Sequence, residues 1–482
     1  MLSLTTLALL SAVVAILWWQ AKIRTRNRTP FPPSPHADPV IGHVRYLPKG
    51  RSELAFINWG KELNTDILYL NLLGQHAIIL FKLDDAIQLL DKAGAKYNDR
   101  PRFDFFVEAG WDTSLTFMSS GPHLRKHRRM FQNALTPSNC FQYQDAQTQE
   151  ARKLVKRLIE SPGEWELHLV TFAVTVILRI AYGITVTGID DPYVKLALNS
   201  SKAVERGGSA GTSLVDLFPV IRKLPTWVKF IPSLKLARDC RVQIVKMQEI
   251  PYEVVKREMV EGTAPPSFTK RLLEETAFET DVEKADTKNK ITEADIKGAA
   301  GTIFGAGTET TWTTLAFFIL HMIQNPDVQK RAQEEVDRVV GPDRLPTFED
   351  QPKLPYVERV FTLVFASAKA INLDKRVYRD PEIFNPDRYL PISEGGAGEP
   401  FPIAQFGFGR RICPGAYLGQ ASLWIAITTL FATLEFRKPR DENGVEYMPC
   451  PGITTGFTSR PEAFNCSIEP RSEKAAVIFT LS

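Results

Sequence analysis

The sequence has few cysteines and no internal repeat. The 482 residues include five cysteines, an odd number that is too small for a disulfide framework. This count excludes such a framework and indicates a reducing compartment. The composition is 44% hydrophobic, 24% charged and 10% aromatic. This ordinary globular balance excludes disordered, collagen-like and disulfide-stabilised miniprotein classes. The length suggests either about three domains or one large enzyme fold.

The first 28 residues lack acidic side chains altogether. They hold four basic residues, Lys22, Arg24, Arg26 and Arg28. The net charge of the whole chain is +4, so the remaining residues sum to zero and the basicity is local to this segment. A nucleic-acid-binding surface is therefore not expected.

Residues 2–19 carry no charge and end in Trp18-Trp19. A run of this length can just span a bilayer, and tryptophan is typical of its interface. The basic residues that follow predict a cytosolic body by the positive-inside rule. A cleaved signal peptide is the alternative, but no basic residue precedes the run and no small-x-small site follows it. We expect a transmembrane anchor over residues 1–21 and a basic, proline-rich hinge over residues 22–40.

The rest of the chain, residues 41–482, predicts a fold that is mainly α with a small β-sheet region. Two apolar, partly β-branched runs flank Gly74-Gln75 within residues 66–82, which predicts a hairpin. Helical patterns dominate from about residue 85 to 340. Long helices are expected at 121–136, 143–160, 164–183 and 240–260.

The segment 292–324 predicts a helix that is apolar on every face. Thr292 with Asp295 forms a capping box, and Asn325-Pro326 ends the helix and opens the next. A second transmembrane span is the alternative. Glu309 and three glycines near the middle make that span costly, so a helix buried at the centre of a large protein is expected.

Residues 306–311 of this helix read AGTETT. Small residues would let a bulky group approach the helix, and Glu309 and Thr310 would bring it an acid and a hydroxyl. Close helix packing explains the same residues, with threonine hydroxyls bonded to carbonyls one turn earlier. The residues alone leave both interpretations open.

Residues 406–415 read FGFGRRICPG, a tight loop around Cys413. An apolar helix from Ala416 to Leu430 is expected to follow. The dipole of that helix would stabilise a thiolate, which predicts a lowered pKa for Cys413. A lone cysteine is more often a small buried hydrophobe. Here, however, the glycines would let the backbone approach a flat partner, and Arg411 could meet an anionic group on it.

This loop resembles the haem-ligand loop of the cytochrome P-450 superfamily, whose pattern is Phe-x-x-Gly-x-Arg-x-Cys-x-Gly. The pattern is met by Phe406, Gly409, Arg411, Cys413 and Gly415. The order of the anchor, the proline hinge, the 306–310 segment and the FNPDR sequence at 384–388 agrees. The resemblance covers essentially the whole chain and is closest to fungal microsomal members.

The resemblance implies a cytochrome P-450 fold with haem b, in which Cys413 is the axial thiolate ligand of the iron and favours O–O cleavage. Glu309 and Thr310 would relay protons to bound dioxygen. Arg411 would meet the haem propionates together with Arg128, the arginine of a Trp-x-x-x-Arg pattern. Leu124 replaces the tryptophan of that pattern, so one propionate hydrogen bond is lost.

The resemblance also implies a monooxygenase that inserts one oxygen atom from dioxygen, with electrons from NADPH through a partner reductase. It would lie in the endoplasmic reticulum membrane as a single-pass protein with a cytosolic catalytic domain. The expected access region is aromatic and apolar: Phe103 to Phe117, the loop near 205–217, and Phe304. A small lipophilic substrate is therefore expected, in fungal secondary metabolism.

The run from His123 to Arg129 is strongly basic. The spacing of His123 and His127 could suggest zinc, but the interleaved cations argue against it. As a hypothesis, Lys126 and Arg129, together with Arg410, receive an acidic electron donor.

One part of the family pattern is missing. After Glu358 the family has a helix with Glu-x-x-Arg and then several strands, and that Glu and Arg pair with the arginine matching Arg388. Here residues 362–366 already read like a later strand, so a few dozen residues are absent near 361–362. Glu335-x-x-Arg338 is expected to be an ordinary exposed pair that does not substitute.

Two consequences follow for the fold. Arg388 would be a buried charge without its carboxylate, and the hairpin at 67–82 would lack sheet neighbours. Either the transcript skips an exon, or this is a degenerate member with impaired haem binding and no catalysis. A haem-poor relic or binding protein on the same fold, and an unrelated membrane-anchored helical enzyme, are the rival hypotheses.

Overall fold

The computed structural model describes residues 30–48, 50–207, 213–280, 290–365, 369–455 and 458–477. Contacts divide the chain into two units. The smaller holds the chain up to residue 46 and residues 56–80, and the larger holds residues 47–55 and 81–482. The expected anchor and the first part of the hinge lie outside the described residues. Residues 30–37 of the hinge contain neither helix nor strand.

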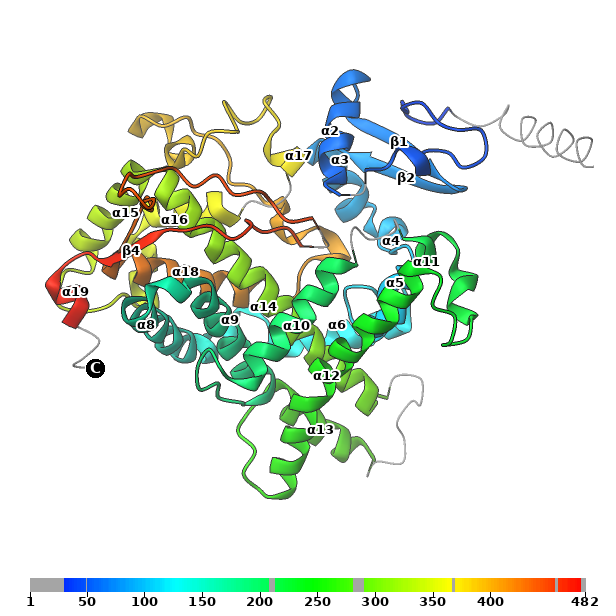
Figure 1. The fold of residues 1–482 in the computed structure, drawn as a ribbon, viewed down its shortest axis with the longest axis horizontal. Coiled ribbons are helices and arrows are strands. Elements are labelled where there is room, and N and C mark those ends of the chain that lie inside the picture. The colour runs from blue at the N-terminus through cyan, green and yellow to red at the C-terminus, as the bar shows by residue number, and fades with distance from the viewer. Residues whose placement is uncertain are drawn as a thin grey trace, which may run out of the picture. The chain divides into compact units, whose positions relative to one another are not determined.

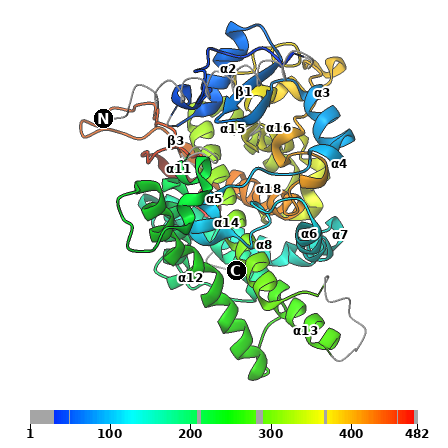
Figure 2. The ribbon, with the colours of Figure 1, turned by 90° about the vertical axis from the view of Figure 1, so that its right-hand side faces the viewer.

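Helices account for most of the described chain (Figures 1 and 2). The α-helices are α2 (Ser52–Glu62), α3 (Leu83–Ala86), α4 (Gly94–Tyr97), α5 (Asp104–Phe106), α6 (Pro122–Ala134), α7 (Pro137–Cys140), α8 (Gln144–Glu160), α9 (Trp165–Tyr182), α10 (Pro192–Arg206), α11 (Leu214–Leu217), α12 (Pro232–Val260), α13 (Phe268–Thr280), α14 (Glu293–Gln324), α15 (Pro326–Val339), α16 (Pro355–Phe365), α17 (Lys369–Asn372), α18 (Ala416–Thr433) and α19 (Glu473–Val477). The strands are β1 (Ile67–Leu72), β2 (Gln75–Leu80), β3 (Leu434–Arg437) and β4 (Ser467–Pro470). The prediction of a mainly α fold with a small sheet region is confirmed.

The smaller unit is built around the predicted hairpin. Strands β1 and β2 are antiparallel, with Leu72 opposite Gln75. The turn is Leu73-Gly74, one residue earlier than expected, and both residues have positive φ, as a two-residue hairpin turn requires. Within the described residues the hairpin gains no third strand, only an isolated bridge from Gly42 to Leu72 and backbone hydrogen bonds such as that from the Tyr69 N–H to the Pro33 carbonyl at 2.9 Å. The expected lack of sheet neighbours is therefore confirmed.

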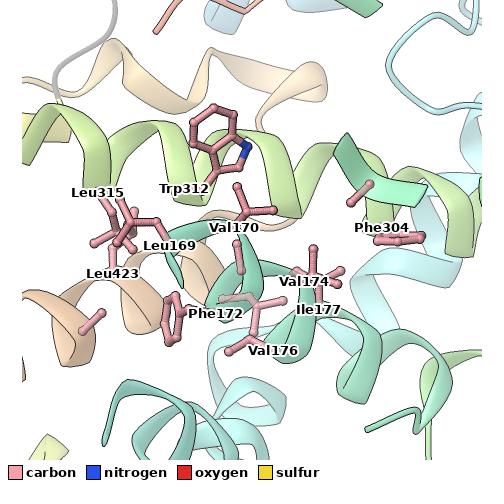
Figure 3. Close-up of a cluster of buried hydrophobic side chains, with 14 of the residues drawn as sticks. Leu169, Val170, Phe172, Val174, Val176, Ile177, Phe304, Trp312, Leu315 and Leu423 are labelled. Carbon is pink, nitrogen blue, oxygen red and sulfur yellow. The ribbon is translucent and has the colours of Figure 1, made fainter. Parts of the chain in front are cut away.

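Helix α14 is the central helix of the larger unit. It contacts α9, α12 and α18, and Thr292 and Asp295 form the predicted capping box at its start. Figure 3 shows its apolar side chains against those of α9, with Leu423 of α18 beside them. Because partners surround it, the helix is apolar on every face, as predicted for a central core helix.

The predicted helices at 121–136, 143–160 and 164–183 correspond to α6, α8 and α9. Helix α12 begins earlier than expected, at Pro232, and continues through Pro251. By length and composition alone, one described helix, Pro162–Tyr182, could cross a membrane, and 83% of its apolar 18-residue stretch is buried inside the protein. This segment contains α9, so it is a core helix of the larger unit.

The expected strand at 362–366 is wrong, because α16 extends to Phe365. The hydroxyl of Thr362 donates to the Glu358 carbonyl at 2.8 Å, and Val360 and Phe361 are buried. The environment of Glu335, at the start of this helix, also differs from the prediction. Glu335 is only 7% exposed and accepts the backbone N–H groups of Tyr356 and Val357, each at 2.9 Å. Glu335 also lies 3.8 Å from Arg338 Nη2, as the predicted i,i+3 pair, but it is buried and caps α16, so the expectation of an ordinary exposed pair is wrong.

Arg388 is buried, as expected, but it is not uncompensated. Its Nη1 lies 3.0 Å from Glu399 Oε2, and the carbonyls of residues 379, 380, 383 and 385 accept its remaining N–H groups. The backbone N–H of Glu399 donates to the Arg388 carbonyl at 2.8 Å. Because the intervening loop folds back, a carboxylate eleven residues later pairs with this charge. The expectation of an unpaired arginine is wrong.

Candidate functional site

The cysteine loop, residues 406–415, is closed by its own backbone. The N–H of Cys413 donates to the Phe406 carbonyl at 2.9 Å, and Gly415 is the N-cap of α18. Gly409 has φ of +52°, and a Cβ there would collide with the carbonyl oxygen of Leu90. A side chain at this position is therefore excluded by both conformation and space. The loop, and the helix from Ala416, have the form that the sequence predicted.

Cys413 is exposed, whereas Cys140 and Cys240 are buried as small hydrophobes. Surrounding protein nonetheless desolvates the thiol and raises its pKa, while the Gly415 N–H and Arg128 act in the opposite direction. The predicted lowered pKa is wrong for this chain alone, because desolvation outweighs the helix terminus. A metal ion would deprotonate the sulfur outright when it coordinates.

Three arginines gather beside the cysteine loop. Arg411 donates through Nε to the Asn98 carbonyl at 2.7 Å. Its buried Nη1 and Nη2 have no hydrogen-bond partner, and the Asp99 carboxylate lies 3.9 Å from Nη2 as a long ion pair. Burial and the nearby charge of Arg100 lower the pKa of Arg411 to about 10. Arg128 donates to the Ile412 carbonyl at 2.6 Å. Like charges held together with unused donors fit an anionic group, such as a carboxylate pair.

Arg100 was not predicted from the sequence. Its approach to Arg411 depends on residues 98–100 folding against the cysteine loop, a contact between segments some three hundred residues apart. No local pattern marks it. Leu124 is buried on α6, and it offers no hydrogen bond in the position where the family has tryptophan.

The 306–311 segment of α14 satisfies both interpretations, on different faces. A Cβ at Gly307 would lie 2.6 Å from Ile177 of α9, so this face is closely packed. Thr310 donates to the Ala306 carbonyl at 2.9 Å, as the packing interpretation expected. However, Ala306 and Thr310 are themselves exposed. This face of a central helix is therefore left accessible to another group.

A cavity, called the α14 cavity here, lies beside this segment. Glu309 lines it and accepts a hydrogen bond from the Thr458 hydroxyl at 2.9 Å. Its walls are Trp111, Ser114, Thr116, Phe117, Val170, Ala197, Leu198, Ser200, Ser201, Val204, Met247, Thr302, Phe304, Gly305, Ala306, Thr308, Glu309, Thr310, Trp312 and Thr458. Phe117 and Phe304 of the predicted access region are among them. Among these residues no lysine or arginine is present, so the cavity is largely apolar with several hydroxyl groups.

The basic run on α6 is partly an internal cluster. Lys126, only 12% exposed at its side chain, pairs with Asp295, and His123 and His127 lie 2.8 and 3.0 Å from the same carboxylate. Two imidazoles and a carboxylate could hold a metal ion by spacing, but the lysine ammonium already occupies Asp295. Lys126 is therefore not part of an exposed donor-binding surface, whereas Arg129 and Arg410 are exposed.

Comparisons with known proteins identify the family of the chain. The cytochrome P-450 family model matches residues 32–362 and 361–456. A cytochrome P-450 monooxygenase of Armillaria gallica is 31% identical over 504 aligned residues, covering 97% of each chain. The tryptamine 4-monooxygenase of Psilocybe cyanescens is 31% identical, covering 97% of this chain and 98% of its own. The cytochrome P-450 monooxygenase claR of Ampulloclitocybe clavipes is 32% identical, covering 94% and 89%.

Proposed function

Because this chain belongs to the cytochrome P-450 family of oxidoreductases, we propose that it is a haem-thiolate monooxygenase. It would insert one oxygen atom from dioxygen into a lipophilic organic substrate. The observation that carries the proposal is that one loop holds both an exposed Cys413 and an Arg411 with buried, unused donors. The cysteine sulfur fits an iron ligand, and the arginine donors fit the propionates of the haem.

Each of these residues has a separate role in haem binding. Haem, when bound, supplies the redox chemistry that activates dioxygen. Cys413 holds the iron, Phe406, Gly409 and Gly415 shape the loop that presents the sulfur, and Arg411 and Arg128 hold the propionates. We add Arg100 to this set because its charge acts on Arg411.

Glu309 and Thr310 would move protons at the α14 cavity. The Glu309 carboxylate is held by the Thr458 hydroxyl, which fixes its position. The Thr310 hydroxyl donates to Ala306 and still has lone pairs to accept from a neighbour. An acid and a hydroxyl one residue apart on an accessible helix face suit proton relay.

Electrons would come from NADPH through a partner reductase. The exposed cations Arg129 and Arg410 are candidates for an acidic surface of that partner. The uncharged segment 2–19 followed by basic residues supports a single-pass anchor in the endoplasmic reticulum membrane, with the catalytic domain in the cytosol. The names of two relatives, a tryptamine 4-monooxygenase and claR, support a role in fungal secondary metabolism.

We also propose that the chain lacks a segment of the family near 361–362. The family model matches in two pieces that meet at residues 361–362, and residues 355–365 form a continuous helix with no Glu-x-x-Arg in it. The second candidate function follows from this observation. A degenerate or mis-spliced member would keep the fold but bind haem poorly and have no catalysis.

A reduced carbon monoxide difference spectrum separates the two. The full chain should give the absorption band of a thiolate-ligated haem, and Cys413→Ala should lose it. Cys450→Ala is the matched control, because Cys450 is also exposed and lies outside the cysteine loop. If the unaltered chain gave no thiolate band, the monooxygenase proposal would fail and the degenerate alternative would stand.

A further inference from the structure

Six threonines lie on α14, and four of them donate their hydroxyl hydrogen to a carbonyl four residues earlier. These are Thr302, Thr310, Thr311 and Thr314. Thr308 and Thr313 are the exceptions among the described residues, since each has a buried Oγ1 without a hydrogen-bond partner. Of these two exceptions, Thr308 lines the α14 cavity and Thr313 does not. Thr308 is 4% exposed.

Trp111 provides a second unused polar group at the same cavity. It is 6% exposed, and its indole Nε1 has no hydrogen-bond partner. It ends the short π-helix Val107–Trp111, and its ring lies against α14 where a Cβ at Gly305 would be 2.7 Å from Cη2. Gly305 therefore lets the tryptophan approach the helix, three residues before Thr308.

Buried polar groups are usually paired, and an orphaned one carries its full desolvation penalty. Neither group is explained by the proton relay, which uses Glu309 and Thr310. The indole N–H can only donate, and a hydroxyl can donate or accept. The missing partner of Trp111 is therefore an acceptor atom.

The charges around the cavity restrict the charge of the ligand that it can accept. Glu309 is its one carboxylate, and its described walls contain no lysine or arginine. An anionic ligand would meet that carboxylate without a cation to balance it. The aromatic walls, among them Phe117 and Phe304, suit a ring system.

We propose that the α14 cavity selects a largely apolar ring compound that has no anionic group and carries an oxygen acceptor of the carbonyl type, and that Trp111 and Thr308 bind this oxygen. The inference deepens the proposed function and rests on the α14 cavity being the substrate site. Trp111 and Thr308 are then the residues that determine specificity.

The test uses two probes with the same skeleton, α-tetralone and tetralin, which differ by one carbonyl. Affinity of the full chain for each is measured by calorimetry, which does not depend on the haem spectrum. Trp111→Phe should weaken tetralone roughly three- to tenfold, the range expected for one hydrogen bond, and change tetralin by less than about twofold. Thr308→Val should do the same.

The matched control is Thr313→Val, which removes the other unpaired threonine hydroxyl of α14 outside the cavity. It should leave both affinities unchanged. If Trp111→Phe and Thr308→Val weakened both probes equally, or neither, the proposed oxygen site would be overturned. A carbon monoxide spectrum of the same samples reports the monooxygenase proposal separately, so either hypothesis can fail while the other stands.

Discussion

Two regions of the larger unit differ in how much of the family pattern they keep. The cysteine loop, residues 406–415, keeps every position of the family pattern, and its backbone closes on itself. The junction region, residues 355–400, contains no Glu-x-x-Arg, and its charges are held by other partners. Glu335 caps α16, and Glu399 pairs with Arg388.

The difference contrasts a local motif with a distributed one. The loop depends on glycines and on a hydrogen bond within ten residues, so the deletion proposed near residues 361–362 would leave it intact. In the family pattern the junction region depends on a carboxylate from the segment that this deletion would remove. A buried arginine cannot remain unpaired, and a loop with Glu399 supplies the replacement. We expect substitutions in the junction region to cost stability and those in the loop to cost haem binding.

The largest effect should come from Glu399→Gln in the junction region. It leaves the buried Arg388 charge without its carboxylate, which costs about 3–5 kcal/mol. The free energy of unfolding by urea measures the loss. Glu394→Gln, an exposed acid in the same loop, should change it by less than about 0.5 kcal/mol. Equal effects from the two variants would show that Glu399 is not the replacement partner.

Acid should weaken the junction region through His321. Its ring stacks on Phe384 with centroids 4.6 Å apart, and burial lowers its pKa from 6.5 to about 4. The unfolded chain binds the proton first, so the stabilisation is full above pH 6.5 and is lost as the pH falls toward 4, by up to about 3 kcal/mol. His321→Phe keeps the stack and should lose correspondingly less stability over that interval. Parallel curves of unfolding free energy against pH for the two proteins would contradict this.

Gly409→Ala should break the cysteine loop. The positive φ and the collision with Leu90 predict a cost of roughly 1–3 kcal/mol, together with reduced haem content. Gly419→Ala is the control. A Cβ there meets nothing within 4 Å, and alanine in a helix should stabilise by about 0.5–1 kcal/mol. Thermal unfolding and haem absorbance report both quantities, and an unaltered Gly409→Ala protein would show that the loop tolerates a side chain.

Arg411→Leu should affect the two forms of the protein differently. In the haem-free chain, removal of the unused donors is offset by loss of the hydrogen bond to the Asn98 carbonyl, so the free energy of unfolding should change by less than about 1 kcal/mol, while the affinity for haem falls. Unfolding of the haem-free chain and haem transfer to apomyoglobin measure the two quantities. A variant that bound haem as tightly as the unaltered chain would remove Arg411 from the proposed propionate site.

The sequence was sufficient where structure is set by neighbouring residues. The hairpin at β1 and β2, the capping box of Thr292 and Asp295, and the loop around Cys413 each depend on a short pattern. The buried character of α14 could also be predicted, because a helix that is apolar on all faces must be surrounded.

The errors arose where a distant contact decides the outcome. Glu335 was expected to be exposed, because its helix position does not reveal that the start of α16 lies beside it. Residues 362–366 are β-branched and aromatic enough for a strand, yet α16 continues through residues 362–365. Arg100 and the pairing of Arg388 with Glu399 likewise require the fold, and burial of the Cys413 thiol outweighs a local dipole.

The most direct test of the account is the haem content of the unaltered full-length chain, purified from a host supplied with haem. If Glu399 and Glu335 restore the junction region, the cysteine loop should hold haem stoichiometrically, as the pyridine haemochrome assay measures. A folded, helical chain by circular dichroism that carries almost no haem would contradict the central claim that the haem site survives the loss of the Glu-x-x-Arg segment.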